Sequence, residues 1–180
     1  MATIFGHAVF ATALGKLFTT KEHKVPPRFW WLAGLCAILP DIDVIAFSFG
    51  IRYGDFFGHR GFTHSIFFAV VVAFIVSRYF FRQSSFSHWK LFWWFFFITM
   101  SHGVLDACTD GGLGVAFFSP ISNARFFFPI RPIAVSPIGL NFFSHRGTMV
   151  LMNETFWIGL LSACLLLLAM IIKRESGKAP

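Results

Sequence analysis

The chain has 180 residues, of which 56% are hydrophobic and only 13% are charged, with a mean hydropathy of +0.69. A soluble domain carries about 25% charged residues, and 27 phenylalanines and 6 tryptophans are more aromatic surface than one small core can bury. The composition therefore excludes an ordinary soluble protein and favours a chain embedded in a lipid bilayer. The length indicates a single domain over residues 1–180.

The formal net charge of +7 can indicate either a nucleic-acid partner or an anionic membrane surface. The lysines and arginines lie between apolar runs, so the sequence favours membrane lipid as the partner and no nucleic acid. The three cysteines are far apart and form no CxxC pair, so we expect small apolar packing residues. They are Cys36, Cys108 and Cys164.

Five apolar segments predict an all-α membrane protein, a bundle of about five transmembrane helices. They cover residues 2–19, 29–48, 62–81, 89–108 and 154–172. Each is close to the length of about 20 residues that a membrane span needs. The first is the weakest, because it carries His7 and Lys16, and it could instead lie at the membrane interface. Residues 109–153 combine many turn signals with many phenylalanines, which predicts a long ordered outer loop.

Positive charge is unevenly distributed between the two ends of this predicted bundle. Nine lysines and arginines on short segments lie at one end: Lys21, Lys24, Arg28, Arg78, Arg82, Lys90, Lys173, Arg174 and Lys178. Five arginines and no lysine lie at the other: Arg52, Arg60, Arg125, Arg131 and Arg146. The positive-inside rule then places the first end and the C-terminus in the cytoplasm. The N-terminus and the long loop are expected on the outside.

Every candidate metal ligand falls at the outer end of the predicted bundle. These residues are His7, Asp41, Asp43, His59, His64, His102 and Asp106. The orientation of the predicted bundle is inferred from lysine and arginine alone. The location of the histidines and aspartates at one end is therefore an independent observation. Ionisable groups inside a bilayer are costly and usually mark function. The sequence therefore predicts a divalent metal site, with zinc most readily bound by imidazole and carboxylate, and manganese or iron as alternatives.

The spacing of these residues limits which of them can act together. His102 and Asp106 are four residues apart and share one helix face, although a hydrogen-bonded brace in the core would show the same spacing. Asp41 and Asp43 point apart on a regular helix. Either Pro40 kinks the segment, or only one aspartate is a metal ligand and the other orients a ligating histidine. A simple acidic helix end in water is the remaining alternative.

The run His59-Arg60-Gly61-Phe62-Thr63-His64-Ser65 is the densest polar stretch of the chain. His64 can point inwards from the start of a helix while His59 reaches over from the loop. The alternative is an interfacial loop with two solvated imidazoles. His7 taken alone would more often be a buried core histidine, and its position at the outer end is what makes it a candidate ligand.

Three of these stretches resemble the motifs of a known family. They are Pro40-Asp41-Ile42-Asp43, His59-Arg60-Gly61-Phe62-Thr63-His64-Ser65 and Ser101-His102-Gly103-Val104-Leu105-Asp106-Ala107-Cys108-Thr109. Gly6-His7 and residues 119–133 also match, as a first-helix histidine and a long loop. On these motifs the chain resembles the membrane-bound metal-dependent hydrolases, the YdjM-like bacterial inner-membrane proteins. The resemblance implies a multi-pass protein of the bacterial cytoplasmic membrane with metal-dependent hydrolase activity.

We expect hydrolysis at the outer, periplasmic face, because a metal ion makes a nucleophile from water at neutral pH. Three acids could take up the proton as general base: Asp43, Asp106 and Glu154. For Glu154, stabilisation of the dipole of the last helix is an equally good explanation.

Three outer arginines are expected to bind an anionic substrate, because arginine pairs with phosphate through two parallel hydrogen bonds. They are Arg60, Arg125 and Arg131. With the site at the membrane interface under an apolar loop, the expected substrate is a phosphoester or another ester of a lipid or lipid-linked molecule. The alternative is a non-catalytic metal-binding or metal-transport protein, although a transporter usually holds its ion near the middle of the bilayer. A structural membrane protein with a metal brace is a third interpretation.

Overall fold

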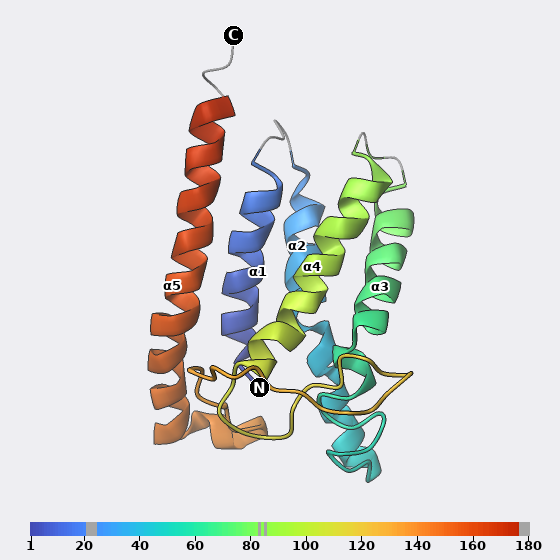
Figure 1. Cartoon of the computed structure of the whole chain (residues 1–180), viewed down its shortest axis with the longest axis vertical. Coiled ribbons are helices and arrows are strands. Elements are labelled where there is room, and N and C mark those ends of the chain that lie inside the picture. Colours follow the sequence, from blue (N-terminus) through green and yellow to red (C-terminus); the bar gives the residue numbers. More distant parts are fainter. Residues whose placement is uncertain (21–24, 83, 85, 177–180) are drawn as a thin grey trace.

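Five α-helices stand side by side in the computed structural model, which describes residues 1–20, 25–82, 84 and 86–176 (Figure 1). They are α1 (Ile4–Phe18), α2 (Pro27–Ile38), α3 (Ile66–Ile75), α4 (His88–Ala107) and α5 (His145–Ser176). Three 3₁₀-helices, η1 (Leu39–Phe49), η2 (Phe62–His64) and η4 (Gly139–Phe143), and one π-helical turn, η3 (Val76–Phe80), complete the described elements. No β-strand occurs among the described residues, so the prediction of an all-α chain is confirmed.

Two helical segments are long and apolar enough to cross a membrane, Pro27–Phe49 and His145–Glu175. The other apolar segments are shorter: α1 has 15 residues, and Ile66–Phe80 falls in the same class. α4 has 20 residues, but His102 and Asp106 interrupt its apolar run. The five predicted segments are thus confirmed as helices in the described chain, but not as five membrane spans.

The second helix changes type at Pro40, at the place where the sequence left two alternatives open. Proline cannot donate the backbone hydrogen bond of an α-helix, and from Leu39 the chain continues as a 3₁₀-helix of 11 residues. Runs of more than 3–4 residues in this conformation are uncommon and often mark a functional segment. Gly50, in the left-handed region with φ 77°, ends it. Pro40 therefore changes the direction in which Asp41 and Asp43 point.

The fifth helix begins at His145, nine residues before the predicted boundary. The first nine residues contain His145, Arg146 and Asn153, whose polarity hides the helix from a search for apolar runs. Gly147 permits the close approach at this start, because a Cβ there would lie 1.8 Å from the carbonyl oxygen of Phe142. The predicted loop is accordingly shorter, and it ends where α5 begins.

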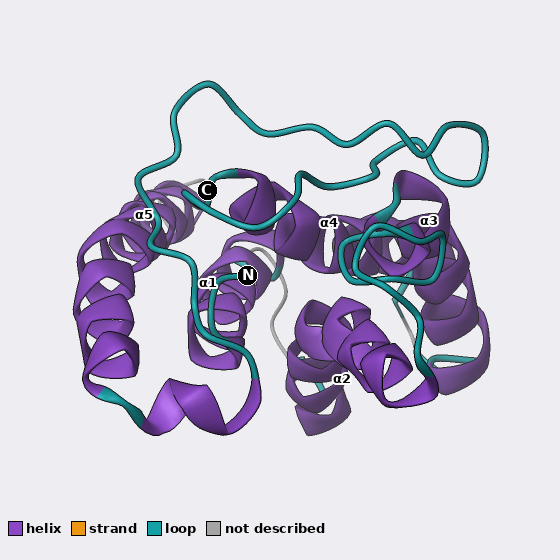
Figure 2. Ribbon diagram, turned by 90° about the horizontal axis from the view of Figure 1, so that it is seen from below, coloured by secondary structure: helices purple, strands orange, loops and turns teal. Residues whose placement is uncertain are grey.

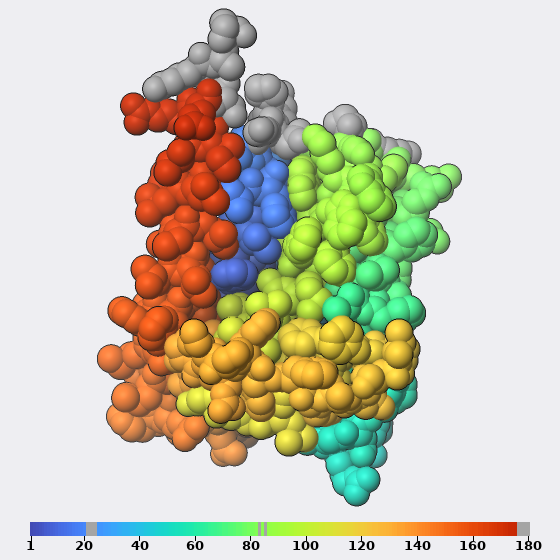
Figure 3. All heavy atoms as spheres, in the orientation of Figure 1, coloured from blue at the N-terminus to red at the C-terminus, as the bar shows by residue number. Residues whose placement is uncertain are grey.

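The long loop covers the end of the bundle where α1 begins and α4 ends (Figures 2 and 3). Isolated bridges tie Thr109 to Ile133 and Val115 to Phe126. The amide of Phe128 donates to the carbonyl oxygen of Ala107 at 2.9 Å, so the loop is also tied to the last turn of α4. The loop is therefore ordered, as the sequence predicts.

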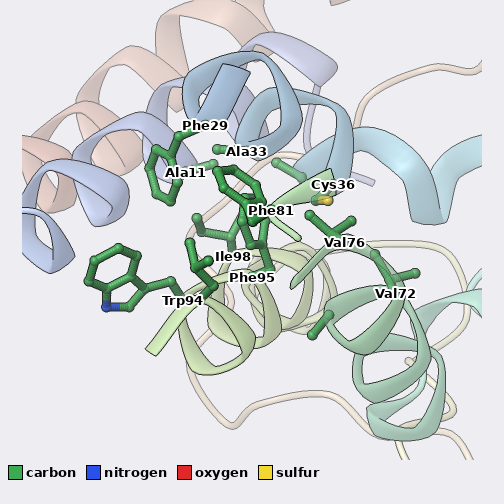
Figure 4. Close-up of a cluster of buried hydrophobic side chains, with 13 residues drawn as sticks. Ala11, Phe29, Ala33, Cys36, Val72, Val76, Phe81, Trp94, Phe95 and Ile98 are labelled. Carbon is green, nitrogen blue, oxygen red and sulfur yellow. The ribbon is translucent and has the colours of Figure 1, made fainter. Parts of the chain in front are cut away.

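The larger apolar core lies among α1, α2, α3 and α4 (Figure 4). Phe29, Phe95 and Ile98 are its large members, each no more than 1% exposed. Alanines such as Ala33 and Ala73 let the helix backbones approach closely. This core fixes the relative positions of η1 and α4, which carry the polar residues described below.

Six of the nine lysines and arginines expected at the cytoplasmic end are described, and they lie at the end of the bundle opposite the long loop. They sit at the start of α2 and α4, in or after η3, and at the end of α5: Arg28, Arg78, Arg82, Lys90, Lys173 and Arg174. Lys21, Lys24 and Lys178, which contribute to the predicted topology, lie outside the described residues. The two ends of the bundle thus differ in charge as the sequence indicates.

Candidate metal centre

A buried polar cluster forms where α1, η1, η2 and α4 meet under the long loop. His7 comes from α1, Asp41 and Asp43 from η1, His59 and Arg60 from the segment between η1 and η2, His64 from η2, and His102 and Asp106 from α4. All eight side chains are between 0% and 8% exposed. The structure therefore brings together all seven ligand candidates that the sequence indicates, and it adds Arg60.

Four atoms of this cluster converge on one point: Asp41 Oδ1, His64 Nε2, His102 Nε2 and Asp106 Oδ2. His64 Nε2 and His102 Nε2 lie 3.1 Å apart, and His102 Nε2 lies 3.3 Å from Asp41 Oδ1. The other measured separations between these nitrogens and the oxygens of Asp41 and Asp106 are 3.6, 3.7 and 4.0 Å. Four ligands about 2.0–2.1 Å from a tetrahedral zinc ion lie about 3.3 Å from one another. The four atoms therefore could hold a divalent ion with small adjustments.

The protons on the two histidines follow from their other partners. His102 Nδ1 lies 2.7 Å from the carbonyl oxygen of Ala37, which can only accept, so Nδ1 carries the hydrogen. The hydroxyl of Thr63 donates to Asp43 at 2.6 Å, so its oxygen accepts from His64 Nδ1 at 3.1 Å. With both rings neutral, the two Nε2 lone pairs would face each other. Such a pair needs a cation, either a proton or a metal ion, between the two nitrogens.

Asp41 is the carboxylate without hydrogen-bond donors. Both of its oxygens are buried, and neither has a hydrogen-bond partner within the described chain. A buried charge in this situation is costly unless a cation stands beside it. Asp41 Oδ1 lies within 3.3–3.7 Å of the Nε2 atoms of His64 and His102. The donor set and the orphaned carboxylate therefore fit a divalent cation.

Asp43, two residues along η1, is surrounded by donors. Its oxygens lie 2.7 Å from His59 Nδ1, 3.1 Å from His64 Nδ1, 2.6 Å from the hydroxyl of Thr63 and 3.2 Å from the amide of Arg60. A carboxylate that accepts from the far nitrogen of a ligating histidine fixes its tautomer and orientation. The geometry of Asp43 is that of an orienting residue.

Asp43, His59 and His64 form a second group that could bind an ion. Within it, however, the 2.7 Å contact between His59 and Asp43 is a hydrogen-bond distance, shorter than the separation of two zinc ligands. Burial lowers the pKa of His59, and the Asp43 carboxylate acts in the opposite direction. His59 Nε2 has no hydrogen-bond partner among the described residues. The geometry thus favours His59 as a brace for Asp43.

Arg60 is fully buried, with a left-handed backbone at φ 62°. Its Nε donates to Asp106 Oδ2 at 3.0 Å, and its terminal nitrogens donate to the carbonyl oxygens of Gly111 and Leu113 and to the hydroxyl of Thr109. These contacts use four of its five N–H groups. The guanidinium is therefore committed to Asp106 and the long loop, and it has little capacity for the substrate anion that the sequence suggests.

His7 lies against the cluster from α1. Its ring stacks on that of His102 with centroids 3.7 Å apart, and its Nε2 lies 3.6 Å from Asp106 Oδ1. Neither nitrogen of His7 has a hydrogen-bond partner among the described residues. Asp106 Oδ1 instead accepts from the amide of Ala2 at 2.8 Å. His7 is thus a neighbour of the four converging atoms and not one of them.

Three other candidates lie away from the converging atoms. Glu154 accepts from the amide and the hydroxyl of Thr3, which caps α1. Arg125 donates to loop carbonyl oxygens, among them that of His59 at 2.9 Å. Arg131 is exposed and lies over the ring of Phe127. Among the described residues, no hydrogen bond or ion pair joins these side chains to the four ligand atoms.

Sequence reasoning missed the contributions of Ala37 and Thr109. The first acts through its backbone carbonyl, for which a sequence gives no signal. Thr109 follows Asp106 by three residues, and its hydroxyl both donates to the Asp106 carbonyl and accepts from Arg60. Its place at the end of the Ser101–Thr109 motif is the one signal that could have identified it.

Comparison with known proteins identifies the family of this chain. A family model described as YdjM inner membrane protein matches residues 1–176. Inner membrane protein YbcI of Escherichia coli (strain K12) is 38% identical over 167 residues, which cover 89% of this chain and 92% of that protein. No solved structure matches the chain. The match over nearly the whole length shows that the chain belongs to the YdjM inner membrane protein family.

Proposed function

We propose that this chain is a metal-dependent hydrolase of the bacterial inner membrane, with one divalent ion held by Asp41, His64, His102 and Asp106. The observation that carries the proposal is the approach of His64 Nε2 to His102 Nε2 at 3.1 Å, beside the Asp41 carboxylate, whose oxygens have no hydrogen-bond partner among the described residues. Zinc suits two imidazoles and two carboxylates best, and manganese and iron accept the same donors. An ion at this position would supply Lewis acidity and lower the pKa of a bound water.

The protein residues around the ion would have separate roles. Asp43 fixes the tautomers of His59 and His64, and a carboxylate that already accepts from several donors is a weak general base. Arg60 holds Asp106 in position, because its Nε donates a hydrogen bond to Asp106 Oδ2. Asp41 has a second oxygen without a partner, so it is the acid best placed to take a proton from an attacking water. This assignment replaces Asp43, Asp106 and Glu154, the three candidates from the sequence.

We further propose that the site faces the periplasm and that the C-terminus is cytoplasmic. The support is the separation of charge between the two ends of the bundle, under the positive-inside rule. A reporter that is active only outside the cytoplasm should be silent when fused after Pro180 and active when inserted at Ile121, which is 95% exposed in the long loop. The reverse pattern would contradict this orientation.

The decisive experiment combines metal analysis with an activity screen on the purified protein. The wild type should contain close to one divalent ion per chain and should hydrolyse at least one member of an ester and phosphoester panel. His102→Ala should lose both properties. His145→Ala, an exposed histidine at the start of α5, is the matched control and should keep both. A wild type without a divalent ion after gentle purification would leave a proton between His64 and His102, and the metal proposal would be wrong.

A metal carrier or transporter is the second candidate, because the same four atoms could bind a cargo ion. The location of the cluster at one end of the bundle argues against transport, since transporters usually bind their ion near the bilayer midplane. Metal uptake into liposomes, without hydrolysis of any substrate in the panel, would favour this second function.

A further inference from the structure

Two cavities meet at Asp41. One is a groove of about 610 Å³ between the α2–η1 segment and the α3–η3 segment, with Leu35, Ile42 and Ile75 among its lining residues. The other, of about 370 Å³, lies beneath η4 and the long loop, where Ser136 and Phe142 contribute to its wall. Among the described residues that line either cavity, Asp41 is the one that carries a carboxylate. Ile4 and Asp41 are the two residues that line both.

The groove has the composition of a site for a hydrocarbon chain. Apart from Asp41, it is lined by aliphatic and aromatic side chains and by Cys36. Large apolar side chains on its rim are exposed, with Leu35 at 57% and Ile75 at 43%. In a protein of the inner membrane such a surface contacts lipid and not water. An acyl or isoprenoid chain can therefore enter the groove sideways from the bilayer.

The length of the groove matches one leaflet. Its lining on α2 and η1 runs from Leu32 to Ile42, which corresponds to about 16 Å at the rise of an α-helix as far as Leu39 and of a 3₁₀-helix beyond it. The hydrocarbon core of a bilayer is about 30 Å thick, so each leaflet is about 15 Å. Asp41 and Ile42 stand at the end of the groove near the long loop. A lipid of the outer leaflet would thus place its polar head beside Asp41 and its chain along α2.

The second cavity provides space for that polar head. It opens next to Asp41 but on the side of the long loop, and its wall is mostly apolar, with Phe5, Ile138 and Phe142 beside the hydroxyl-bearing residues Thr3 and Ser136. A bond between head and chain would then lie at the junction next to Asp41, whose Oδ1 lies against His64 and His102. This arrangement separates the two parts of an amphiphile across the proposed ion site.

We propose that the substrate of the site is an amphiphile with one long hydrocarbon chain, which lies in the groove between α2 and α3 while its ester or phosphoester linkage reaches Asp41. The identity of the reaction rests on the proposed hydrolase function, but occupancy of the groove does not. Cleavage adds water across the linkage, so that the chain-bearing alcohol or acid remains in the groove and the polar head leaves through the cavity under the loop.

Chain binding is tested with a long-chain alkyl phosphate that carries a photoactivatable group near the end of the chain. The protein is reconstituted in lipid nanodiscs, irradiated and mapped by mass spectrometry. Ile75→Trp and Leu35→Trp fill the groove at exposed positions that tolerate a larger side chain. Val70→Trp is the matched control, because Val70 is 38% exposed on the same helix but does not line the groove.

In the wild type, label should concentrate on the peptides that carry Leu35 and Ile75. Either groove-filling variant should reduce it about tenfold, because losing contact with about two methylenes changes affinity by that much. The control should label like the wild type, and all variants should retain the metal content of the wild type. Label spread evenly over the exposed faces of α3 and α5, and unchanged in Ile75→Trp, would overturn the proposal.

Hydrolysis separates this inference from the proposed function. The groove predicts that Ile75→Trp slows cleavage of a long-chain substrate and leaves cleavage of a water-soluble short-chain analogue unchanged. Equal cleavage of both substrates by wild type and variant would overturn the groove and leave the hydrolase intact. Labelling of the groove without hydrolysis of any substrate would support the lipid site and overturn the hydrolase.

Discussion

The two aspartates of η1 are two residues apart and have opposite surroundings. Asp43 accepts from His59, Thr63 and the amide of Arg60, and lies beside His64. Asp41 is also largely enclosed, with its side chain 8% exposed, but neither of its oxygens has a hydrogen-bond partner among the described residues. Buried polar groups are almost always hydrogen-bonded, so an unpartnered carboxylate needs a specific explanation. The comparison distinguishes the residue that is free to hold an ion from the one that orients its neighbours.

The largest loss of metal affinity should follow a substitution of Asp41. Asp41→Asn keeps the shape of the side chain but removes the negative charge that Asp41 would contribute to the binding of the ion. We expect metal affinity to fall by more than about 100-fold, beyond the range typical of outer-shell partners. Competition with a chelator of known affinity measures it. Metal binding as tight as in the wild type would show that Asp41 is not a ligand.

A smaller loss of metal affinity should follow the same aspartate-to-asparagine substitution at Asp43. Asp43→Asn leaves all four converging atoms in place but weakens the hydrogen bonds that fix the tautomers of His59 and His64. Loss of such a partner typically reduces metal affinity about 10–100-fold. At saturating metal, Asp43→Asn should still bind one ion per chain. A loss as severe as that of Asp41→Asn would mean that both aspartates bind metal directly.

Arg60→Lys tests the link between the cluster and the long loop. Lysine keeps the charge but cannot donate to Asp106, Gly111 and Leu113 at once. Because the variant leaves buried acceptors unpaired, we expect a loss of stability of about 1–3 kcal/mol, with a weaker effect on metal affinity than that of Asp43→Asn. Thermal unfolding of the metal-loaded protein measures the first effect. Unchanged stability with reduced substrate affinity would restore the substrate-binding role expected from the sequence.

The sequence was sufficient to predict the convergence of the histidines and aspartates, because helix periodicity and the alternation of helix direction place them at one end of the bundle. His102 and Asp106 share a face as their spacing indicates. The different roles of Asp41 and Asp43 could not be predicted, because they depend on an 11-residue 3₁₀-helix that local sequence does not specify. Arg60 was equally inaccessible, since two of its partners are carbonyl oxygens about fifty residues away.

The smallest effect on metal binding is expected for Glu154, which lies outside the comparison between the two aspartates. Its carboxylate accepts from both the amide and the hydroxyl of Thr3, and so joins the start of α1 to α5. Glu154→Gln keeps one acceptor oxygen but turns an amide towards a donor. The expected result is a loss of stability of about 1 kcal/mol, the size of one hydrogen bond, with metal content and affinity unchanged.

Turnover of the same variant decides whether Glu154 has a second role. If it only braces α1, Glu154→Gln should hydrolyse substrate at nearly the rate of the wild type, measured below its unfolding temperature and with metal bound. Thr3→Ala removes the hydroxyl that donates to Glu154, which is one of the two hydrogen bonds between these residues. It is the matched control for the structural effect. A variant that retains metal but loses turnover, while Thr3→Ala remains active, would assign the general base to Glu154 and remove that role from Asp41.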